Sequence, residues 1–186
     1  MKGIAFMEAI VAPVAWEQLD KTGIRSALEA LRSEAGETMV LQKNYLIEEI
    51  LPKALLRKLS DEEMAEYRRP FAAPGEGRRP TLTWPRQIPI QGEPPDVAAI
   101  AAAYADWLAT SGVPKLFLKV EPGAFLANEA LVNLVRRWPA LTEKTVAGVH
   151  FVQEDSPDEI GRAVAGWMGT LADGAPRKAA MSGATG

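Results

Sequence analysis

The sequence contains no cysteine, and it has only one histidine among its 186 residues. The missing thiols exclude disulfides, thiolate metal sites and a cysteine nucleophile. A chain without disulfides fits a reducing compartment, so we expect a cytoplasmic protein. Because His150 is the only imidazole, any acid–base chemistry that uses histidine must run through this one residue.

Long apolar runs are missing as well. No run approaches the roughly 20 residues that a membrane-spanning helix needs, and the first residues lack the basic and apolar pattern of a signal peptide. The formal net charge is −3, with 21 basic against 24 acidic residues, which is not the balance of a nucleic-acid-binding protein. We therefore expect neither a membrane nor a nucleic acid as partner, and no metal ion or cofactor.

What the sequence does contain is an alternation of short apolar segments with helical patterns. Residues 3–7, 115–120 and 145–149 are each typical of a buried strand. The first has no polar alternation, which favours a strand that is buried on both faces. Helical patterns follow at 96–110, 128–137 and 156–171. Strands that alternate with helices predict an α/β fold with a parallel sheet.

The region between the first and second strands has a different texture, because helical stretches there are separated by proline- and glycine-rich breaks. Helices are predicted at 25–32 and 44–51, and Ser60 with Glu63 forms the capping box of a third helix. The chain is accordingly divided into four parts: a core strand in 1–11, a helical cap in 12–92, a second core segment in 93–171 and a disordered tail in 172–186.

Two side chains are placed where chemistry is expected in such a sheet. Glu8 follows the first strand and His150 follows the last, and active sites of parallel sheets lie beyond the carboxyl ends of the strands. A carboxylate here can accept the Nδ1–H of a histidine, while the imidazole acts as a general base. The residues alone leave the plainer interpretation open: a carboxylate that happens to follow a strand, and a histidine packed in a loop.

Three long segments resemble one known family. Residues 2–10 (KGIAFMEAI) are similar to the strand of haloalkane dehalogenases that ends in their catalytic glutamate. Residues 78–90 (RRPTLTWPRQIPI) resemble the end of their cap domain, and residues 149–161 (VHFVQEDSPDEIG) resemble the segment that starts with their catalytic histidine. Smaller matches extend the resemblance over about residues 2–171. It implies the C-terminal part of an α/β-hydrolase fold with a helical cap insertion, without the N-terminal half of the sheet.

The resemblance also implies a reaction and a set of site residues. In this family a carboxylate displaces halide from a small haloalkane to form an alkyl–enzyme ester, and histidine activates the water that hydrolyses the ester. Glu8 matches the acid of the catalytic triad and His150 the base. Leu46, Trp84 and Pro85 match positions that line the substrate pocket, and ordinary packing within the cap is the alternative explanation for them.

The sequence departs from the family at the nucleophile. The order nucleophile, acid, histidine puts the nucleophile on a strand-to-helix turn before the acid, yet no Gly-x-Ser-x-Gly turn or aspartate equivalent occurs here. With the acid at position 8, we expect the nucleophile to belong before Met1 and this chain to be inactive alone. The alternatives are a non-catalytic module that needs a complementing N-terminal chain, an inert truncation product, and a relative of the coelenterazine luciferases.

Overall fold

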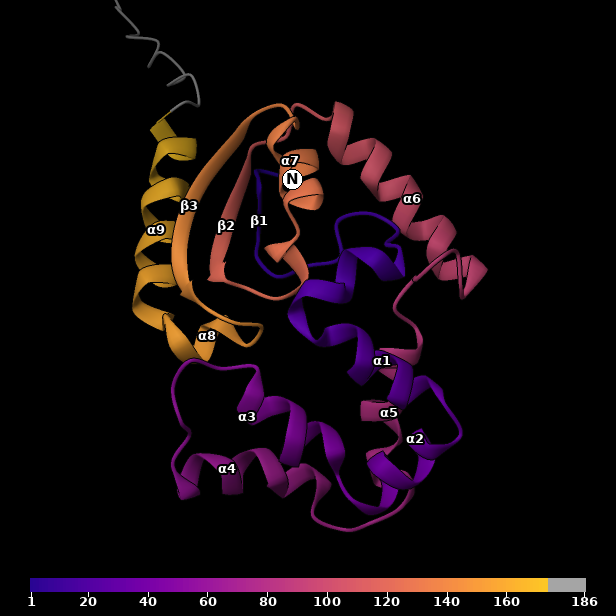
Figure 1. Ribbon diagram of the computed structural model, residues 1–186. Coiled ribbons are helices and arrows are strands. Elements are labelled where there is room, and N and C mark those ends of the chain that lie inside the picture. Colours follow the sequence, from indigo (N-terminus) through magenta and orange to yellow (C-terminus); the bar gives the residue numbers. More distant parts are fainter. Residues whose placement is uncertain (174–186) are drawn as a thin grey trace, which may run out of the picture.

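A computed structural model describes residues 1–173, without the side chains of residues 20–22, 172 and 173. Three parallel strands, β1 (Ile4–Phe6), β2 (Lys115–Pro122) and β3 (Leu141–Gly148), form one sheet in the order β1-β2-β3 (Figure 1). The predicted α/β class and parallel sheet are therefore confirmed. Most of the predicted tail, residues 174–186, lies outside the described residues.

Both faces of the sheet are covered by helices. Leu116 and Leu118 of β2 pack on one face against α9 (Pro157–Asp173), while Phe117 packs on the opposite face against α7 (Glu129–Arg136). Figure 1 shows α9 and α7 on opposite sides of the sheet. This alternation explains the apolar run at residues 116–118 of β2, because successive side chains of a strand point to opposite faces and both faces are covered.

Strand β3 begins at Leu141, four residues before its predicted start. The whole strand pairs with β2, from Leu141 opposite Lys115 to Gly148 opposite Pro122. Among the described residues β3 has a neighbour on one side only, and Lys144 and Thr145 are exposed on it. A polar edge strand lacks the apolar run on which the prediction depended, and charged residues are a common protection of such edges.

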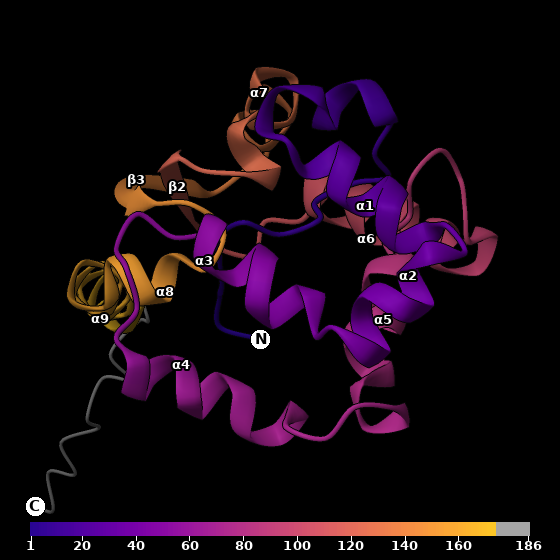
Figure 2. The same cartoon turned by 60° about the horizontal axis from the view of Figure 1, so that its bottom comes forward.

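Helical segments connect β1 to the rest of the core. They lie beyond the carboxyl ends of the strands, where Figures 1 and 2 show α1, α3 and α4. Their side chains form two apolar clusters of their own, one around Leu51 and Met64 and one around Val40 and Leu82. The segments are η1 (Trp16–Thr22), α1 (Ile24–Arg32), α2 (Ala35–Glu37), η2 (Thr38–Gln42), η3 (Leu46–Ile50), α3 (Leu51–Lys53), α4 (Asp61–Arg68), η4 (Arg69–Phe71), η5 (Glu76–Arg78) and α5 (Arg79–Arg86).

Helix boundaries follow the capping signals in most places. Ser60 Oγ accepts the Glu63 N–H, and Glu63 reaches back to the Ser60 N–H, so the predicted capping box of α4 is confirmed. Asn128 caps α7 through the Ala130 N–H, at the start of the predicted helix 128–137. The helix predicted from Asn44 begins only at Leu46, because Asn44 has a left-handed φ of 54°.

The long helix α6 (Pro95–Thr110) leads into β2 and agrees with the predicted range 96–110, with one more residue at its start. Its C-cap is Ser111, in an extended conformation. Ile100 and Trp107 on this helix are exposed, whereas Ala101 is buried. The Tyr104 hydroxyl donates to the Ile10 carbonyl and attaches the helix to the segment after β1. No helix among residues 1–173 is long and apolar enough to cross a membrane.

The amino end of the sheet is closed by a buried lysine. Lys115 is fully buried, its ammonium donates to the carbonyls of Ser111, Val113 and Pro139 at 2.6–3.2 Å, and desolvation lowers its pKa. We expect Lys115→Met to lower the free energy of unfolding by about 1–3 kcal/mol, because the carbonyls of Ser111, Val113 and Pro139 lose their shared donor. Urea denaturation measures this, with Lys144→Met on the exposed edge as control. Equal effects of the two changes would contradict the prediction.

Candidate active site

Glu8 follows β1 and is fixed by the loop that follows β2. Its carboxylate accepts the N–H groups of Ala124 at 3.0 Å, Phe125 at 2.8 Å and Leu126 at 3.4 Å. The side chain is 3% exposed, and the backbone takes a left-handed φ of 43°. Three backbone donors replace the water that an ionised carboxylate loses on burial. The loop thereby holds the carboxylate in one orientation.

His150 lies next to this carboxylate although 142 residues separate the two. Its Nδ1 is 3.4 Å from Oε2 of Glu8, and its side chain is 21% exposed. The rings of Phe125 and Phe151 each have their centroid 5.1 Å from that of the imidazole. A carboxylate at Nδ1 favours the tautomer with its proton there and leaves Nε2 free to act as a base.

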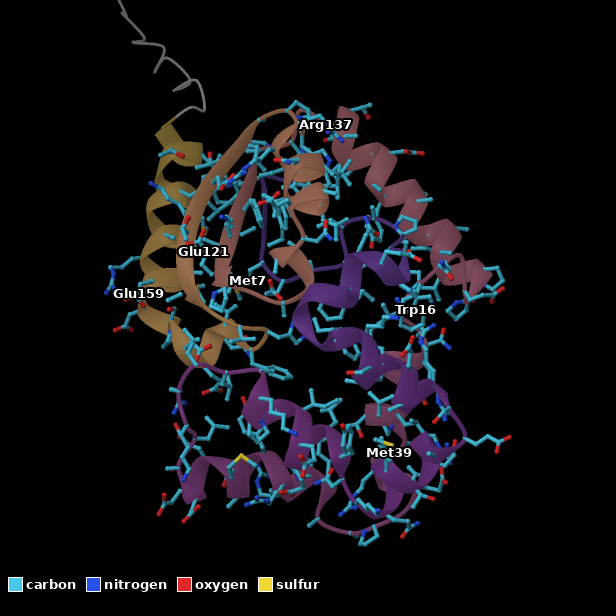
Figure 3. The ribbon with its side chains drawn as sticks, viewed as in Figure 1. Met7, Trp16, Met39, Glu121, Arg137 and Glu159 are labelled. Carbon is cyan, nitrogen blue, oxygen red and sulfur yellow. The ribbon has the colours of Figure 1, made fainter. Side chains whose placement is uncertain are left out.

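Parallel pairing explains why these two side chains meet. Glu8 and His150 follow the carboxyl ends of β1 and β3, and the loop after β2 lies between these strands. In Figure 3, Met7 and Glu121 mark this end of the sheet, close to the start of α9 at Glu159. The predicted convergence of Glu8 and His150 is therefore present in the fold, and their catalytic roles remain a proposal.

Gly123 makes the loop around Glu8 possible. Its φ is +69°, and a Cβ at this position would lie 2.7 Å from the Val120 carbonyl oxygen and 3.1 Å from Oε1 of Glu8. We expect Gly123→Ala to cost about 1–3 kcal/mol of stability, because an L side chain is strained at this φ. Thermal unfolding provides the measurement, and Gly166→Ala in the exposed part of α9 is the control. A melting temperature unchanged by Gly123→Ala would rule out this role.

The three predicted pocket residues are placed in two different surroundings. Leu46 packs against the cluster around Leu51. Phe151, which follows His150 in the sequence, packs against the same cluster. Trp84, on α5, is 57% exposed, and Pro85 is buried. Trp84 borders a pocket of about 270 Å³ together with Tyr104 and neighbouring residues of α6, and the walls of that pocket include neither Glu8 nor His150.

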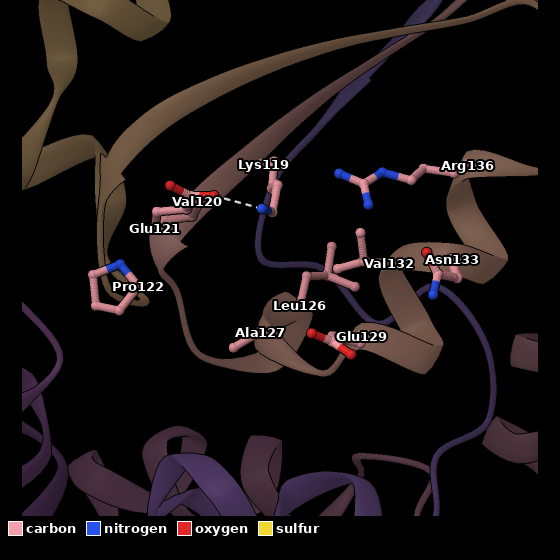
Figure 4. Close-up of a pocket in the computed structure, with 10 residues that line it drawn as sticks. All are labelled: Lys119, Val120, Glu121, Pro122, Leu126, Ala127, Glu129, Val132, Asn133 and Arg136. Carbon is pink, nitrogen blue, oxygen red and sulfur yellow. Dashed lines mark hydrogen bonds and ion pairs between the residues drawn. The ribbon is translucent and has the colours of Figure 1, made fainter.

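A larger pocket, of about 470 Å³, lies between β2 and α7 (Figure 4). Its cations already have partners: Lys119 pairs with Glu121 at 2.5 Å, and Arg136 pairs with Glu143 at 2.7 Å. Paired cations offer little to an anionic ligand. No group of three potential metal-ligating side chains occurs among the described residues. The Glu8–His150 pair therefore remains the candidate site.

Sequence reasoning missed the groups that surround His150. Phe125 and the carbonyl of Ala54, which accepts the His150 N–H at 3.1 Å, come from segments that showed no functional pattern. Asp155 was given no role in the sequence, yet its carboxylate accepts the Val149 N–H at 3.2 Å. The signal for Asp155 was its place, five residues after His150 and directly before the start of the predicted helix 156–171.

No protein-family model matches the sequence. A haloalkane dehalogenase of Sphingobium indicum is 54% identical over 171 residues, which are 92% of this chain and 57% of that enzyme. A coelenterazine h 2-monooxygenase of Renilla reniformis is 40% identical over 167 residues, 88% of this chain and 52% of that protein. The chain therefore spans little more than half the length of these curated relatives.

The fold leads to the same family. The crystal structure of the haloalkane dehalogenase DbeA from Bradyrhizobium elkani superposes with a TM-score of 0.86 at 38% identity, and the match covers 93% of this chain and 60% of that one. The likeness thus extends over nearly every described element, the helical segments after β1 included. By sequence and by fold, the chain is similar to the C-terminal part of haloalkane dehalogenases, with the parallel strands and flanking helices of that part of an α/β-hydrolase fold.

Proposed function

We propose that this protein supplies the acid and the base of a haloalkane dehalogenase. The single observation that carries the proposal is the 3.4 Å contact between Nδ1 of His150 and the buried carboxylate of Glu8. In the proposed roles, His150 removes a proton from water and Glu8 stabilises the imidazolium that forms. Leu46, Trp84 and Pro85 are the proposed pocket residues, and we also propose a cytoplasmic location, supported by the lack of cysteine.

The proposed reaction has two displacements. A carboxylate nucleophile attacks the carbon that bears the halogen, the carbon–halogen bond breaks with its electron pair, and halide leaves as an alkyl–enzyme ester forms. His150 then takes a proton from water, whose oxygen attacks the ester carbonyl. The ester bond breaks, the alcohol leaves, and the carboxylate is restored. One haloalkane and one water give one alcohol, one halide and one proton.

The nucleophile is the part of this reaction that residues 1–186 do not provide. Their sequence has no strand-to-helix turn of the nucleophile type. We propose that a complementing N-terminal segment supplies it, whether on the same polypeptide or on a partner chain. Residues 1–186 alone are then expected to release halide only at the background rate, since loss of one member of a triad typically costs several orders of magnitude.

The test compares the protein with a chimera. In the chimera, the N-terminal part of the Sphingobium indicum enzyme that this chain does not match is fused before residue 1. Halide release from 1-bromobutane or 1,2-dibromoethane is measured for both, each with a His150→Ala version. We expect multiple turnovers only from the chimera, and none from its His150→Ala version.

Each other outcome has a definite meaning. A folded chimera without halide release would contradict the proposed activity, and oxidation of coelenterazine by it would favour the kind of activity named for the Renilla reniformis relative. Halide release by residues 1–186 alone, lost in His150→Ala, would show that this chain contains a nucleophile. A carboxylate such as Glu48 would then be the first to replace.

A further inference from the structure

The carboxylate of Asp155 bonds both the turn between α3 and α4 and the segment around His150. Asp155, the last residue of α8 (Val152–Asp155), accepts the N–H groups of Leu56 at 2.9 Å and Arg57 at 3.1 Å through Oδ1. Its Oδ2 accepts the N–H of Val149 at 3.2 Å. The two oxygens thus face two chain segments that are almost one hundred residues apart. A charged acceptor makes each of these bonds stronger than its neutral equivalent.

A second set of bonds joins the same two segments. The carbonyl of Ala54 accepts the N–H groups of His150 at 3.1 Å and Phe151 at 3.2 Å. The backbone of His150 is therefore held on both sides, through Val149 by Asp155 and through its own N–H by Ala54. All of these bonds fix the histidine relative to the turn at residues 54–57, and none of them involves the imidazole.

The side chain of Glu154 adds further bonds between these segments. Its carboxylate pairs with the guanidinium of Arg57 at 2.6 Å and accepts the Tyr67 hydroxyl at 2.6 Å. Burial, followed by the bond to Glu154, raises the pKa of Tyr67 to about 12. Arg57 also pairs with Glu63 at 2.7 Å and lowers the pKa of that carboxyl to about 2. Tyr67 therefore stays neutral and Glu63 stays ionised through the neutral range.

The two members of the candidate pair are held by different parts of the chain. Glu8 is bound by the loop at residues 124–126, and His150 is bound by the turn at residues 54–57. Their own contact, at 3.4 Å, is already at the long end of a hydrogen bond. A shift of a few tenths of an ångström in the turn is enough to break it. The orientation of the imidazole thus depends on the bonds by which Asp155 holds Val149 against Leu56 and Arg57.

We propose that Asp155 is a positioning residue that sets the tautomer of His150 by holding its backbone against the turn at residues 54–57. The proposal rests on the proposed function of Glu8 and His150 and adds to it a residue that touches neither substrate nor imidazole. Asp155 acts through Val149, Leu56 and Arg57, so its loss leaves the imidazole intact while moving it away from Glu8.

The experiment uses the single histidine as its probe. Nitrogen-15 NMR of the neutral imidazole distinguishes the Nδ1–H from the Nε2–H tautomer, and one histidine gives one unambiguous set of signals. We expect the Nδ1–H form to dominate in the wild type. Asp155→Asn removes the charge and turns an N–H group toward the backbone donors, so the ratio of Nδ1–H to Nε2–H should fall at least about tenfold. Asp158→Asn, an exposed carboxylate on α9, is the matched control and should leave the ratio unchanged.

The outcomes separate this inference from the function on which it rests. An Nε2–H tautomer in the wild type would contradict the Glu8–His150 pairing itself. A wild type with Nδ1–H and a folded Asp155→Asn with the same ratio would overturn the role of Asp155 alone. If Asp155→Asn does not fold, Asp155→Glu is measured instead, because it keeps the charge and lengthens the side chain. Folded Asp155→Glu must then show the same fall in the ratio of Nδ1–H to Nε2–H. Failure of both variants to fold would make Asp155 a residue of stability and would equally overturn the proposal.

Discussion

His150→Gln in the chimera is expected to release about one equivalent of halide and then to turn over about 10⁴-fold more slowly than the unchanged chimera. The first displacement needs only the carboxylate nucleophile and the halide-bearing carbon, so it proceeds without a base. The second needs a proton to leave water, and glutamine cannot accept it. The alkyl–enzyme ester therefore accumulates.

Rapid-quench halide measurement gives the size of the burst, and mass spectrometry of the quenched protein gives the mass of the trapped alkyl group. Gln153→Ala, an exposed change three residues after His150, is the control and should keep full turnover. Steady turnover by His150→Gln close to that of the control would remove His150 from the role of base. Absence of the burst would place His150 in the first displacement instead.

Strand β2 was predictable because its apolar residues 116–118 pack on both faces of the sheet. Strand β1 was predicted to be buried on both faces, yet Ala5 is exposed and Ile4 and Phe6 are half-buried. Strand β3 was predicted four residues too short, because its first half is an edge whose side chains meet water. Hydrophobic pattern thus finds the interior strand well, whereas the edge is set by its backbone register with β2.

Capping residues predicted where a helix starts, whereas the side of a helix that is buried was harder to predict. Ser60 bonds the Glu63 N–H that the capping box indicated, because a cap depends on residues within the same turn. The exposed Ile100 and Trp107 of α6 could not be anticipated in this way. Which side of a helix is buried depends on the partners that tertiary packing brings to it.

The sequence predicted the two side chains of the candidate site but not the groups that hold them. Glu8 and His150 have side chains whose chemistry is specific and whose places follow strands, so topology alone predicts that they meet. Their supports are backbone groups: the N–H groups of residues 124–126, and the carbonyl of Ala54. Every residue carries such groups, so only the folded chain reveals which of them point at the site.

Glu8→Gln in the chimera is expected to lower steady turnover by about 10³–10⁴-fold. Glutamine keeps the shape of the side chain, but its amide carries no charge to stabilise the imidazolium. Its NH₂ group must also take the place either of Oε1, which accepts the Leu126 N–H, or of Oε2, which accepts the N–H groups of Ala124 and Phe125 and contacts Nδ1 of His150. In the second case the amide donates to Nδ1 and favours the wrong tautomer, in which Nε2 bears the proton and cannot act as a base.

The size of the halide burst distinguishes a fall in turnover caused by the missing carboxylate from a fall caused by unfolded protein. The first displacement does not use Glu8, so Glu8→Gln should still release about one equivalent of halide, as His150→Gln does, while the later turnover is slow. Circular dichroism gives the folded fraction to which both quantities are referred. Glu121→Gln is the matched control: this carboxylate lies near the carboxyl end of β2, is exposed, and pairs with Lys119 instead of a histidine. Turnover by Glu8→Gln within tenfold of that control would exclude Glu8 as the acid, because a carboxylate that orients and stabilises the imidazole must contribute more than an exposed one.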